Sequence, residues 1–591
     1  MKQFFGAFFG SILGLIVATL LAVFVVVAVI KSSVGDMFKE EKATSSIARN
    51  SVLKLVLEGE LLERERENPF KGLGSNSPFN GGEGLGLNAL LKKINYAKSD
   101  TNVKGLYIQF KDFNAGFAAM QELRNGISDF KKSGKFVYTY AESYSQMDYF
   151  LASASTKVFL NPQGDLEWKG LGMSLMFFKQ AFEKLEIDMQ VFRHGKFKSA
   201  VEPFILDKMS EANRYQSETF LNSIWGTMLE AISKDRHISV PELQSMANTL
   251  SIQYPEDAVG KFVDELLYED EVMNKLKSTT GLKEKDKLKL VDLGKYEAKT
   301  KYNAKLNNSK IAVVYASGSI GGGEGDDEEI GSDRLAKAIR EARLDSNIKA
   351  IVLRVNSPGG SALASDVIWR EVVLAKKAKP MVVSMGNLAA SGGYYISCGA
   401  DRIFAQPNTI TGSIGVFGLI PNLQRMLQNK LGISIDTVNT NKYSDMGTGL
   451  RKVNEYEYTY IQNSVEKVYD TFTKRVAEGR GMTQAEVDSI GQGRVWTGED
   501  ALKIKLVDEL GGLNEAIAYA AKKAKLKEYK LNEMPKQKNP FDAFFGNKET
   551  ELETRIIKRN LGPTYLYFKQ VQNLLKLKGV QARLPFEVVF N

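Results

Sequence analysis

The sequence NIKAIVLRVNSPGGSA, at residues 347–362, decides the fold class of this chain. Its apolar core AIVLRV is typical of a buried strand, and a glycine-containing loop follows directly. A related sequence, NVKGLYIQF, begins at Asn102, which is 245 residues before Asn347. Around both sequences, hydrophobic runs alternate with helical patterns. This βαβ rhythm predicts an α/β fold with a mainly parallel sheet covered by helices.

The same spacing recurs along some two hundred residues and indicates a duplicated domain. FVYTYA at Phe136 falls on MVVSMG at Met381 with the offset of 245, and VDEL at Val263 falls on VDEL at Val507 with an offset of 244. Matches at almost constant offset are the signature of an internal repeat. The predicted units are an N-terminal anchor (residues 1–31), a first domain (51–300), a second domain (310–526) and a C-terminal tail (533–591).

The N-terminal segment predicts a membrane anchor. Residues 4–30 carry no charge over 27 positions, and about 20 apolar residues suffice to cross a bilayer as a helix. The segment is too long for the apolar core of a cleaved signal peptide, so we expect one uncleaved transmembrane helix. The flanking lysines do not fix its orientation, because long domains are translocated largely regardless of nearby charge.

Composition excludes several classes of function. The net charge of +9 over 591 residues is spread along the chain, which argues against a nucleic-acid partner. Two histidines and one cysteine are too few for a zinc site or an intrachain disulfide. The phosphate-binding motif GxxxxGK[ST] is absent. We therefore expect no metal and no cofactor, and we interpret the acidic run in GGGEGDDEEIG as a solvated loop.

Two motifs of the second domain follow predicted strands, where sites of parallel sheets are built. In RVNSPGGSA, the amides of Gly359 and Gly360 have the freedom of approach that an oxyanion hole requires. In NLAASGGYYIS, Ser391 opens a helix directly after a strand and is a candidate nucleophile. An equally weighted interpretation is that Ser391 only caps this helix.

A serine nucleophile needs a base, and neither His194 nor His237 lies in a motif that would supply one. The alternative is a neutral lysine, whose pKa must fall by about 3 units, or about 4 kcal/mol, through burial. Lys198 in FRHGKFKSAVEPFIL precedes an apolar segment and is our candidate, with Lys196 as its rival. Either lysine is otherwise a surface charge on an edge strand.

The duplication discriminates between these interpretations. The offset of 245 places Gln146 where the first domain would carry the serine. The same offset places DFNA, at residues 112–115, where the second domain has SPGG, at residues 357–360. An offset of 246 places KYS, at residues 442–444, where the first domain has KFK, so the second domain lacks the lysine. Each copy keeps the half of a Ser/Lys pair that the other has lost. This pattern predicts an active site assembled between the two domains.

The motifs RVNSPGGS, NLAASGGYYIS, TITGSIGVFG and GKFKSAVEPF together resemble the signal peptide peptidase A (protease IV) family in its long, tandem form. The resemblance implies two Clp protease/crotonase-like domains, each a spiral of βαβ units. It implies Ser391 as nucleophile and Lys198 as general base, with Ser413 orienting the lysine amine. The oxyanion donors it implies are the amides of Gly359 or Gly360 and of Gly392, and it implies no cofactor.

The resemblance also implies a setting. The family acts at the bacterial cytoplasmic (inner) membrane, with a single membrane pass, catalytic domains on the outer (periplasmic) side, a homotetramer, and released signal peptides as substrates. We therefore expect a membrane-anchored serine endopeptidase. The alternative is a non-proteolytic crotonase-like scaffold or acyl-binding protein in which Ser391 only caps a helix. His194, next to the lysine motif, departs from the family pattern and is a candidate modulator of Lys198.

Overall fold

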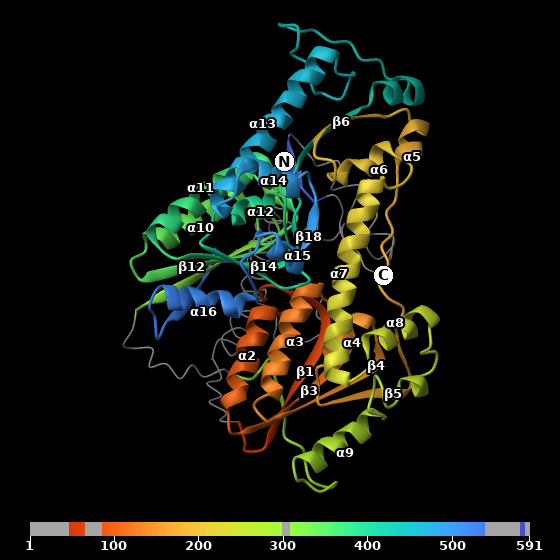
Figure 1. Cartoon of the computed structure of the whole chain (residues 1–591), viewed down its shortest axis with the longest axis vertical. Coiled ribbons are helices and arrows are strands. Elements are labelled where there is room, and N and C mark those ends of the chain that lie inside the picture. The colour runs from red at the N-terminus through yellow and green to blue at the C-terminus, as the bar shows by residue number, and fades with distance from the viewer. Residues whose placement is uncertain (1–46, 66–84, 298–307, 538–579, 585–591) are drawn as a thin grey trace, which may run out of the picture. The chain divides into compact units, whose positions relative to one another are not determined.

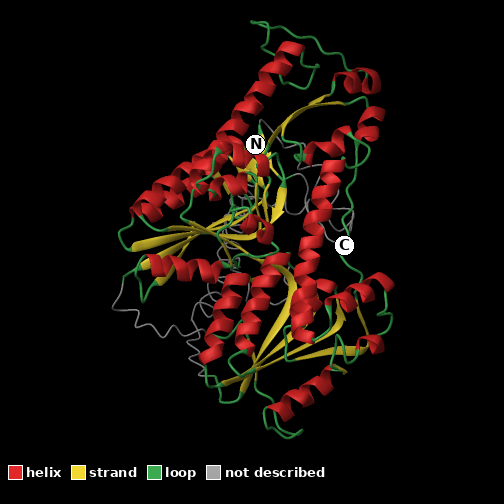
Figure 2. Ribbon diagram, in the orientation of Figure 1, coloured by secondary structure: helices red, strands yellow, loops and turns green. Residues whose placement is uncertain are grey.

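The computed structural model of the chain describes residues 47–65, 85–297, 308–537 and 580–584 (Figure 1). The anchor predicted at residues 4–30 lies outside these ranges. Within them, no helix is both long and apolar enough to span a bilayer. Helices and strands alternate through the described chain, which confirms the α/β class (Figure 2).

The first repeat is built on a parallel sheet. Its described strands run in the order β2-β1-β3-β4-β5-β7, with β8 paired to β1. Residues 51–57 of strand β1 are mostly apolar because helices and loops cover this part of the sheet, and Val52, Leu53 and Leu57 have no exposed surface. The elements are β1 (Ser51–Leu62), β2 (Leu85–Gly86), α2 (Leu87–Ser99), β3 (Val103–Asn114), α3 (Phe117–Lys131), β4 (Phe136–Tyr144), α4 (Gln146–Ala152), β5 (Lys157–Leu166), α5 (Lys179–Lys184), β6 (Asp188–His194), α6 (Glu202–Ile205), α7 (Glu211–Arg236), α8 (Val240–Thr249), β7 (Glu265–Leu266), α9 (Glu269–Thr279) and β8 (Leu290–Asp292).

The second repeat has the same plan. Its described sheet runs β18-β16-β14-β12-β9-β20, with β15 beside β14 and β19 beside β15. The elements are β9 (Lys310–Ser317), β10 (Ile320–Gly321), β11 (Ile330–Gly331), α10 (Ser332–Leu344), β12 (Ile348–Ser357), β13 (Gly359–Ser361), α11 (Ala362–Ala378), β14 (Met381–Ala390), α12 (Gly392–Ser397), β15 (Arg402–Ala405), β16 (Ile410–Gly412), β17 (Val416–Asn422), α13 (Glu455–Arg480), α14 (Gln484–Ile490), β18 (Val495–Thr497), α15 (Gly498–Lys503), β19 (Glu509–Leu510), α16 (Leu513–Lys523) and β20 (Lys530–Met534). Helices α7 and α13, both of 26 residues, occupy corresponding places in the two repeats.

One alignment made from the sequence is wrong by a residue. Strand β14 has ten residues where β4 has nine, so the helices that follow begin at Gln146 and Gly392. Ser145, rather than Gln146, is therefore the counterpart of Ser391. The Ser145 hydroxyl accepts a hydrogen bond from Asp148 N (3.1 Å) and donates one to Asp148 Oδ2 (2.7 Å). This hydroxyl is used by a capping box, so the first repeat still offers no free nucleophile at that place.

A third sheet joins the two repeats. Its described strands run β11-β10-β13-β21-β17-β6, where β21 is Gln581–Arg583. Strand β6 belongs to the first repeat by sequence, yet it pairs antiparallel with β17 of the second, from His194 opposite Val416 to Asp188 opposite Asn422. Figure 1 shows β6 running toward α13, which it contacts. This pairing carries the residues after β6, including Lys198, into the second repeat.

A buried ion cluster also connects the repeats. The guanidinium of Arg354, on β12, lies 2.7 Å from a carboxylate oxygen of Glu63 and 2.8 Å from one of Glu122. Glu122 Oε1 also accepts a hydrogen bond from the backbone N–H of Leu513 at 2.6 Å. Burial alone lowers the pKa of an arginine, but the two carboxylates raise the pKa of Arg354 above its ordinary value. Burial raises the pKa of Glu122, and Arg354 opposes that rise without cancelling it.

Candidate active site

Ser391 lies at the sharp turn between β14 and α12. Its backbone has φ 54° and ψ −113°, a conformation that a residue with a side chain rarely adopts. The Ser391 side chain makes no capping hydrogen bond to α12. Its Oγ lies 2.9 Å from Lys198 Nζ instead. The hydroxyl is therefore available for chemistry and is not used to cap the N-terminus of α12.

Lys198 follows the turn after β6, and its backbone is fixed by long-range contacts. The N–H of Phe197 donates to the carbonyl of Gln492 (2.8 Å), and Gln216 Nε2 donates to the carbonyl of Phe197 (3.1 Å). The Lys198 amine also lies 3.0 Å from Ser413 Oγ and 3.3 Å from the Ser413 carbonyl oxygen. The amine is thus held by three oxygens, all of them uncharged.

Burial controls the charge of this amine. Lys198, Ser391 and Ser413 have no exposed surface. Loss of hydration lowers the pKa of Lys198 well below its ordinary value, and among the described residues no carboxylate opposes that shift. The site therefore favours a neutral amine, which has the lone pair that a general base needs.

Two glycines make room for the lysine side chain. A Cβ on Gly415 would lie 3.2 Å from Lys198 Cδ. Gly493 has φ +77°, and a Cβ there would lie 2.6 Å from Lys198 N and 2.7 Å from Lys198 Cβ. Larger residues at either position would displace the amine. Gly415 belongs to the motif TITGSIGVFG, but no motif named above includes Gly493, whose signal in the sequence is the run GQGRVW.

Of the three predicted oxyanion glycines, Gly359 lies against Gly392, the residue that follows Ser391. A Cβ on Gly359 (φ +96°) would lie 2.6 Å from the backbone nitrogen of Gly392, and one on Gly360 would lie 2.0 Å from the carbonyl oxygen of Ile320. The Gly359 N–H already donates to Ser357 Oγ at 3.2 Å. Because the Gly359 amide is already used in this way, Gly360 is the better candidate of the two for an oxyanion donor beside Gly392.

The rival groups lie elsewhere. The Lys196 side chain is exposed, and its Nζ lies over the ring of Phe197. His194 Nδ1 lies 2.5 Å from Glu466 Oε2, and the His194 ring stacks on Tyr469 at 3.7 Å between centroids. Among the described residues, no hydrogen bond joins His194 to Lys198. His237 ends α7 in a left-handed conformation.

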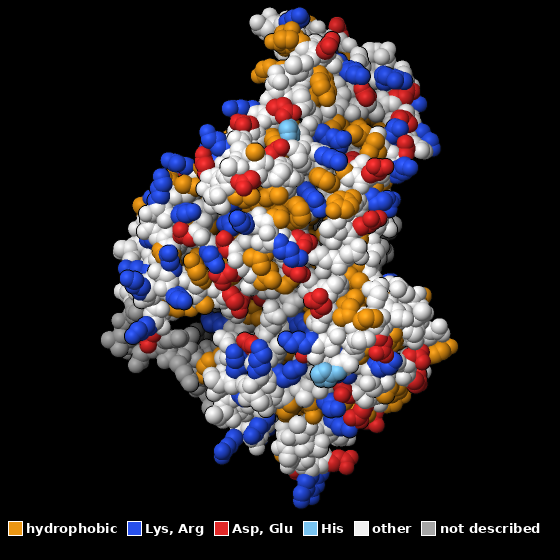
Figure 3. Space-filling view, viewed as in Figure 1, with side chains coloured by type: hydrophobic (Ala, Val, Ile, Leu, Met, Phe, Trp, Pro, Cys, Tyr) orange, Lys and Arg blue, Asp and Glu red, His pale blue; other side chains and the backbone are white. Residues whose placement is uncertain are grey.

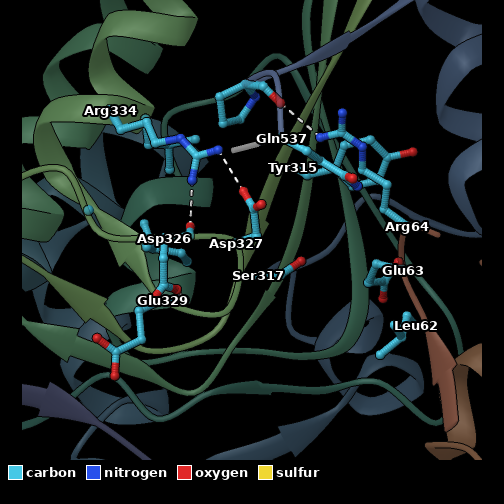
Figure 4. A pocket seen from close by; sticks show the side chains of 14 residues that line it. Leu62, Glu63, Arg64, Tyr315, Ser317, Asp326, Asp327, Glu329, Arg334 and Gln537 are labelled. Carbon is cyan, nitrogen blue, oxygen red and sulfur yellow. Dashed lines mark hydrogen bonds and ion pairs between the residues drawn. The ribbon is translucent and has the colours of Figure 1, made fainter. Parts of the chain in front are cut away.

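The acidic loop forms part of a separate pocket of about 120 Å³ (Figure 4). Arg334 pairs with Asp327 at 2.6 Å, and Asp326 Oδ1 accepts the backbone N–H groups of Glu328 and Glu329. In the part of the chain that the structure describes, no cluster of His, Cys, Asp or Glu has a metal-binding arrangement. On the face drawn in Figure 3, basic and acidic side chains are interspersed rather than gathered into a basic patch.

The sequence of this chain is similar to those of known proteins. A model of peptidase family S49 matches the chain twice, at residues 129–283 and 374–527. Protease 4 of Salmonella typhi is 38% identical over 456 residues, which are 75% of this chain and 73% of that protein. The chloroplastic serine protease SPPA of Arabidopsis thaliana is 32% identical over 487 residues, 81% of this chain and 70% of that protein. Fold, site and matches together define a serine peptidase. The chain belongs to peptidase family S49, and its two matches confirm the predicted tandem form.

Among solved structures, a ClpP1 N165D mutant from Listeria monocytogenes aligns with 35% of this chain and 94% of its own length. The TM-score is 0.24 and the sequence identity is 15%. A similarity at this level decides nothing about topology. The α/β class rests on the strands and helices themselves, and the Clp protease/crotonase-like spiral stays a prediction.

Proposed function

We propose that this peptidase is an endopeptidase with a Ser/Lys dyad formed across its two repeats. Ser391 is the nucleophile and Lys198 the general base. The observation that carries the proposal is the 2.9 Å separation of Lys198 Nζ from Ser391 Oγ, in a buried site without a counter-charge among the described residues. A neutral amine at hydrogen-bond distance is the group that can accept the serine proton at neutral pH.

The proposed reaction uses the site in two halves. Ser391 Oγ attacks the scissile carbonyl carbon while Lys198 Nζ takes the hydroxyl proton. The negative charge that develops on the carbonyl oxygen is stabilised by the amides of Gly360 and Gly392. The lysine ammonium, oriented by Ser413, then donates its proton to the departing amine. A water molecule hydrolyses the acyl-enzyme in the same way, with Lys198 again as the base.

The proposed substrates are released signal peptides and similar hydrophobic peptides. The family resemblance supports these substrates. We also propose, on the same resemblance, an anchor at residues 4–30 in the cytoplasmic membrane of a bacterium, catalytic repeats on the periplasmic side, and a homotetramer. The rival candidate, a crotonase-like scaffold or acyl-binding protein with Ser391 as a helix cap, is disfavoured because the Ser391 hydroxyl makes no capping bond.

The test is cleavage of a hydrophobic signal-peptide sequence by the full chain and four variants. Ser391→Ala and Lys198→Ala should each abolish cleavage, and the double variant should lose little more, because the two residues act as one unit. Lys196→Ala is the matched control and should keep most of the activity. Cleavage that survives Ser391→Ala refutes the proposal, and a dead Lys196→Ala with an active Lys198→Ala reassigns the base.

A further inference from the structure

The loop at residues 491–494, between α14 and β18, holds the backbone on both sides of the proposed base. The carbonyl of Gln492 accepts the N–H of Phe197 at 2.8 Å, one residue before the lysine. The carbonyl of Arg494 accepts the N–H of Ser413 at 2.7 Å, and the hydroxyl and carbonyl oxygens of Ser413 both contact the lysine amine. A shift of this 491–494 loop therefore moves the amine and the group that orients it together.

Two side chains outside the 491–494 loop fix its position. The hydroxyl of Tyr469, on α13, accepts the backbone N–H of Gln492 at 3.2 Å and donates to Asp488 Oδ1, on α14, at 2.5 Å. Asp488 Oδ1 also accepts a hydrogen bond from Gln492 Nε2. Tyr469 is 5% exposed, so water does not readily take the place of its hydroxyl. The three residues thus form a closed triangle of hydrogen bonds at the start of the loop.

The first repeat keeps this helix contact but not the acceptor. Helices α7 and α13 begin 244 residues apart, as do α8 and α14. This offset places Trp225 at the position of Tyr469. It places Gln244 at the position of Asp488, and Trp225 Nε1 donates to Gln244 Oε1 at 2.7 Å. An indole N–H can only donate, whereas a phenol hydroxyl also accepts. The additional acceptor is therefore found in the repeat whose loop reaches the lysine.

We propose that Tyr469 is a positioning residue for the general base: its hydroxyl holds the 491–494 loop, and this loop holds the Lys198 amine against Ser391. This inference rests on the proposed function. The amine lies 2.9 Å from Ser391 Oγ and 3.0 Å from Ser413 Oγ, so a small displacement lengthens both contacts. Displacement also opens the buried amine to water, which favours its charged form and raises its pKa. Loss of the Tyr469 hydroxyl should therefore impair the base through both geometry and protonation.

The groups around Tyr469 keep its hydroxyl protonated. Burial and the hydrogen bond to Asp488 raise the pKa of Tyr469 above its ordinary value of about 10, and Glu466 on the same helix adds to the rise. The N–H of Gln492 opposes the rise without cancelling it. The ring of His194, on β6, stacks on the phenol at 3.7 Å between centroids. Because His194 and Glu466 are unchanged in the variants below, a shifted activity profile reports the lysine.

The experiment measures kcat and KM for a hydrophobic signal-peptide sequence as a function of pH, with the full chain. Tyr469→Phe should lower kcat about 10-fold at pH 7, the effect expected from one hydrogen bond, with little change in KM. The midpoint of the rise of activity with pH should move up, toward the value of about 10.4 for a free lysine. Asp488→Leu should have the same effects, and the double variant should lose little more, because both side chains act through Gln492. Gln244→Leu is the matched control: it breaks the corresponding bond to Trp225 and should leave kcat and the midpoint unchanged.

The outcomes separate this inference from the proposed function. If Tyr469→Phe changes kcat and the midpoint no more than Gln244→Leu does, the positioning role is refuted, while activity that depends on Ser391 keeps the dyad. A lower kcat with an unchanged midpoint also overturns the positioning role, because the midpoint does not depend on the amount of active protein. A rise in KM alone places the defect in peptide binding and overturns it as well. If no activity depends on Ser391, both proposals fall.

Discussion

Replacing Arg354 by methionine should destabilise the protein far more than the loss of an ordinary surface charge. The guanidinium is fully buried and neutralises two carboxylates that are themselves almost fully buried, at 2.7 and 2.8 Å. Removing it leaves Glu63 and Glu122 buried without their counter-charge. Breaking a buried pair in this way costs about 3 to 5 kcal/mol. The expected loss is of that size in the free energy of unfolding, measured by urea denaturation with far-UV circular dichroism.

Two controls separate charge from packing. Lys132→Met removes an ion pair with Asp129 whose lysine is 76% exposed, and it should cost less than about 1 kcal/mol. Adding Glu63→Leu and Glu122→Leu to Arg354→Met should recover much of the loss, because an apolar cluster replaces all three charges. If the triple variant is less stable than Arg354→Met alone, packing rather than unpaired charge explains the defect. If Arg354→Met alone lowers the free energy of unfolding no more than Lys132→Met does, the electrostatic argument is refuted.

The pH dependence of this defect has a definite sign. Without Arg354, burial acts on Glu122 with no opposing cation, so the pKa of this carboxyl rises further in the folded state. A carboxyl with a raised folded pKa stabilises the fold below its unfolded pKa, about 4.3, and this stability is lost as pH rises through the folded pKa. The Arg354→Met defect should therefore shrink as pH falls from 7 toward about 4. A defect that is constant over this range contradicts the electrostatic explanation.

Three further predictions concern the lysine. Peptidase activity should rise with pH as Lys198 loses its proton, with a midpoint below the value of about 10.4 for a free lysine. His194→Gln should leave this rise unchanged. If the rise is lost in His194→Gln, the imidazole rather than Lys198 is the base. Lys198→Met should be inactive yet more stable at pH 7. Because the pKa of Lys198 is lowered in the folded state, the stability of the wild type should rise with pH up to about 10.4. The gain in the free energy of unfolding of Lys198→Met over the wild type, measured in urea, should therefore be smaller at pH 10 than at pH 7. An equal gain at both pH values shows that the amine is charged in the folded state. Gly493→Ala should lower kcat about 100-fold by displacing Lys198, whereas Gly260→Ala, at a similar φ of +79° with nothing nearby, should not; equal activity of the two variants refutes the steric role of Gly493.

The sequence predicts that Ser391 and Lys198 belong to one site because the duplication supplies an internal comparison. Ser391 and Lys198 were each ambiguous alone, and only the complementary loss between repeats distinguished them from a helix cap and a surface charge. The structure brings both to one place. The one-residue error at Gln146 arose because a longer strand in the second repeat shifts the register locally without changing the overall offset.

Other features depend on contacts between distant segments and left weaker signals. Gly493 matters only because its backbone passes Lys198, which no local pattern reveals. Arg354 was visible as a charge within the apolar run AIVLRV, but its partners lie 291 and 232 residues away. Strand β21 has only three residues and pairs with a strand more than two hundred residues earlier, so the tail received no assignment from sequence.

The pairing of β6 with β17 has a consequence for biosynthesis. Lys198 leaves the ribosome 193 residues ahead of Ser391, so at about 5 to 20 residues per second the two are separated by about 10 to 40 s of translation. During that interval the nascent chain carries the lysine that we propose as the base but not the serine that we propose as the nucleophile, and β6 has not yet met its partner strand β17. The order of synthesis thus delays proteolytic competence until most of the polypeptide exists. A prematurely terminated product that ends before Ser391 therefore lacks the proposed nucleophile.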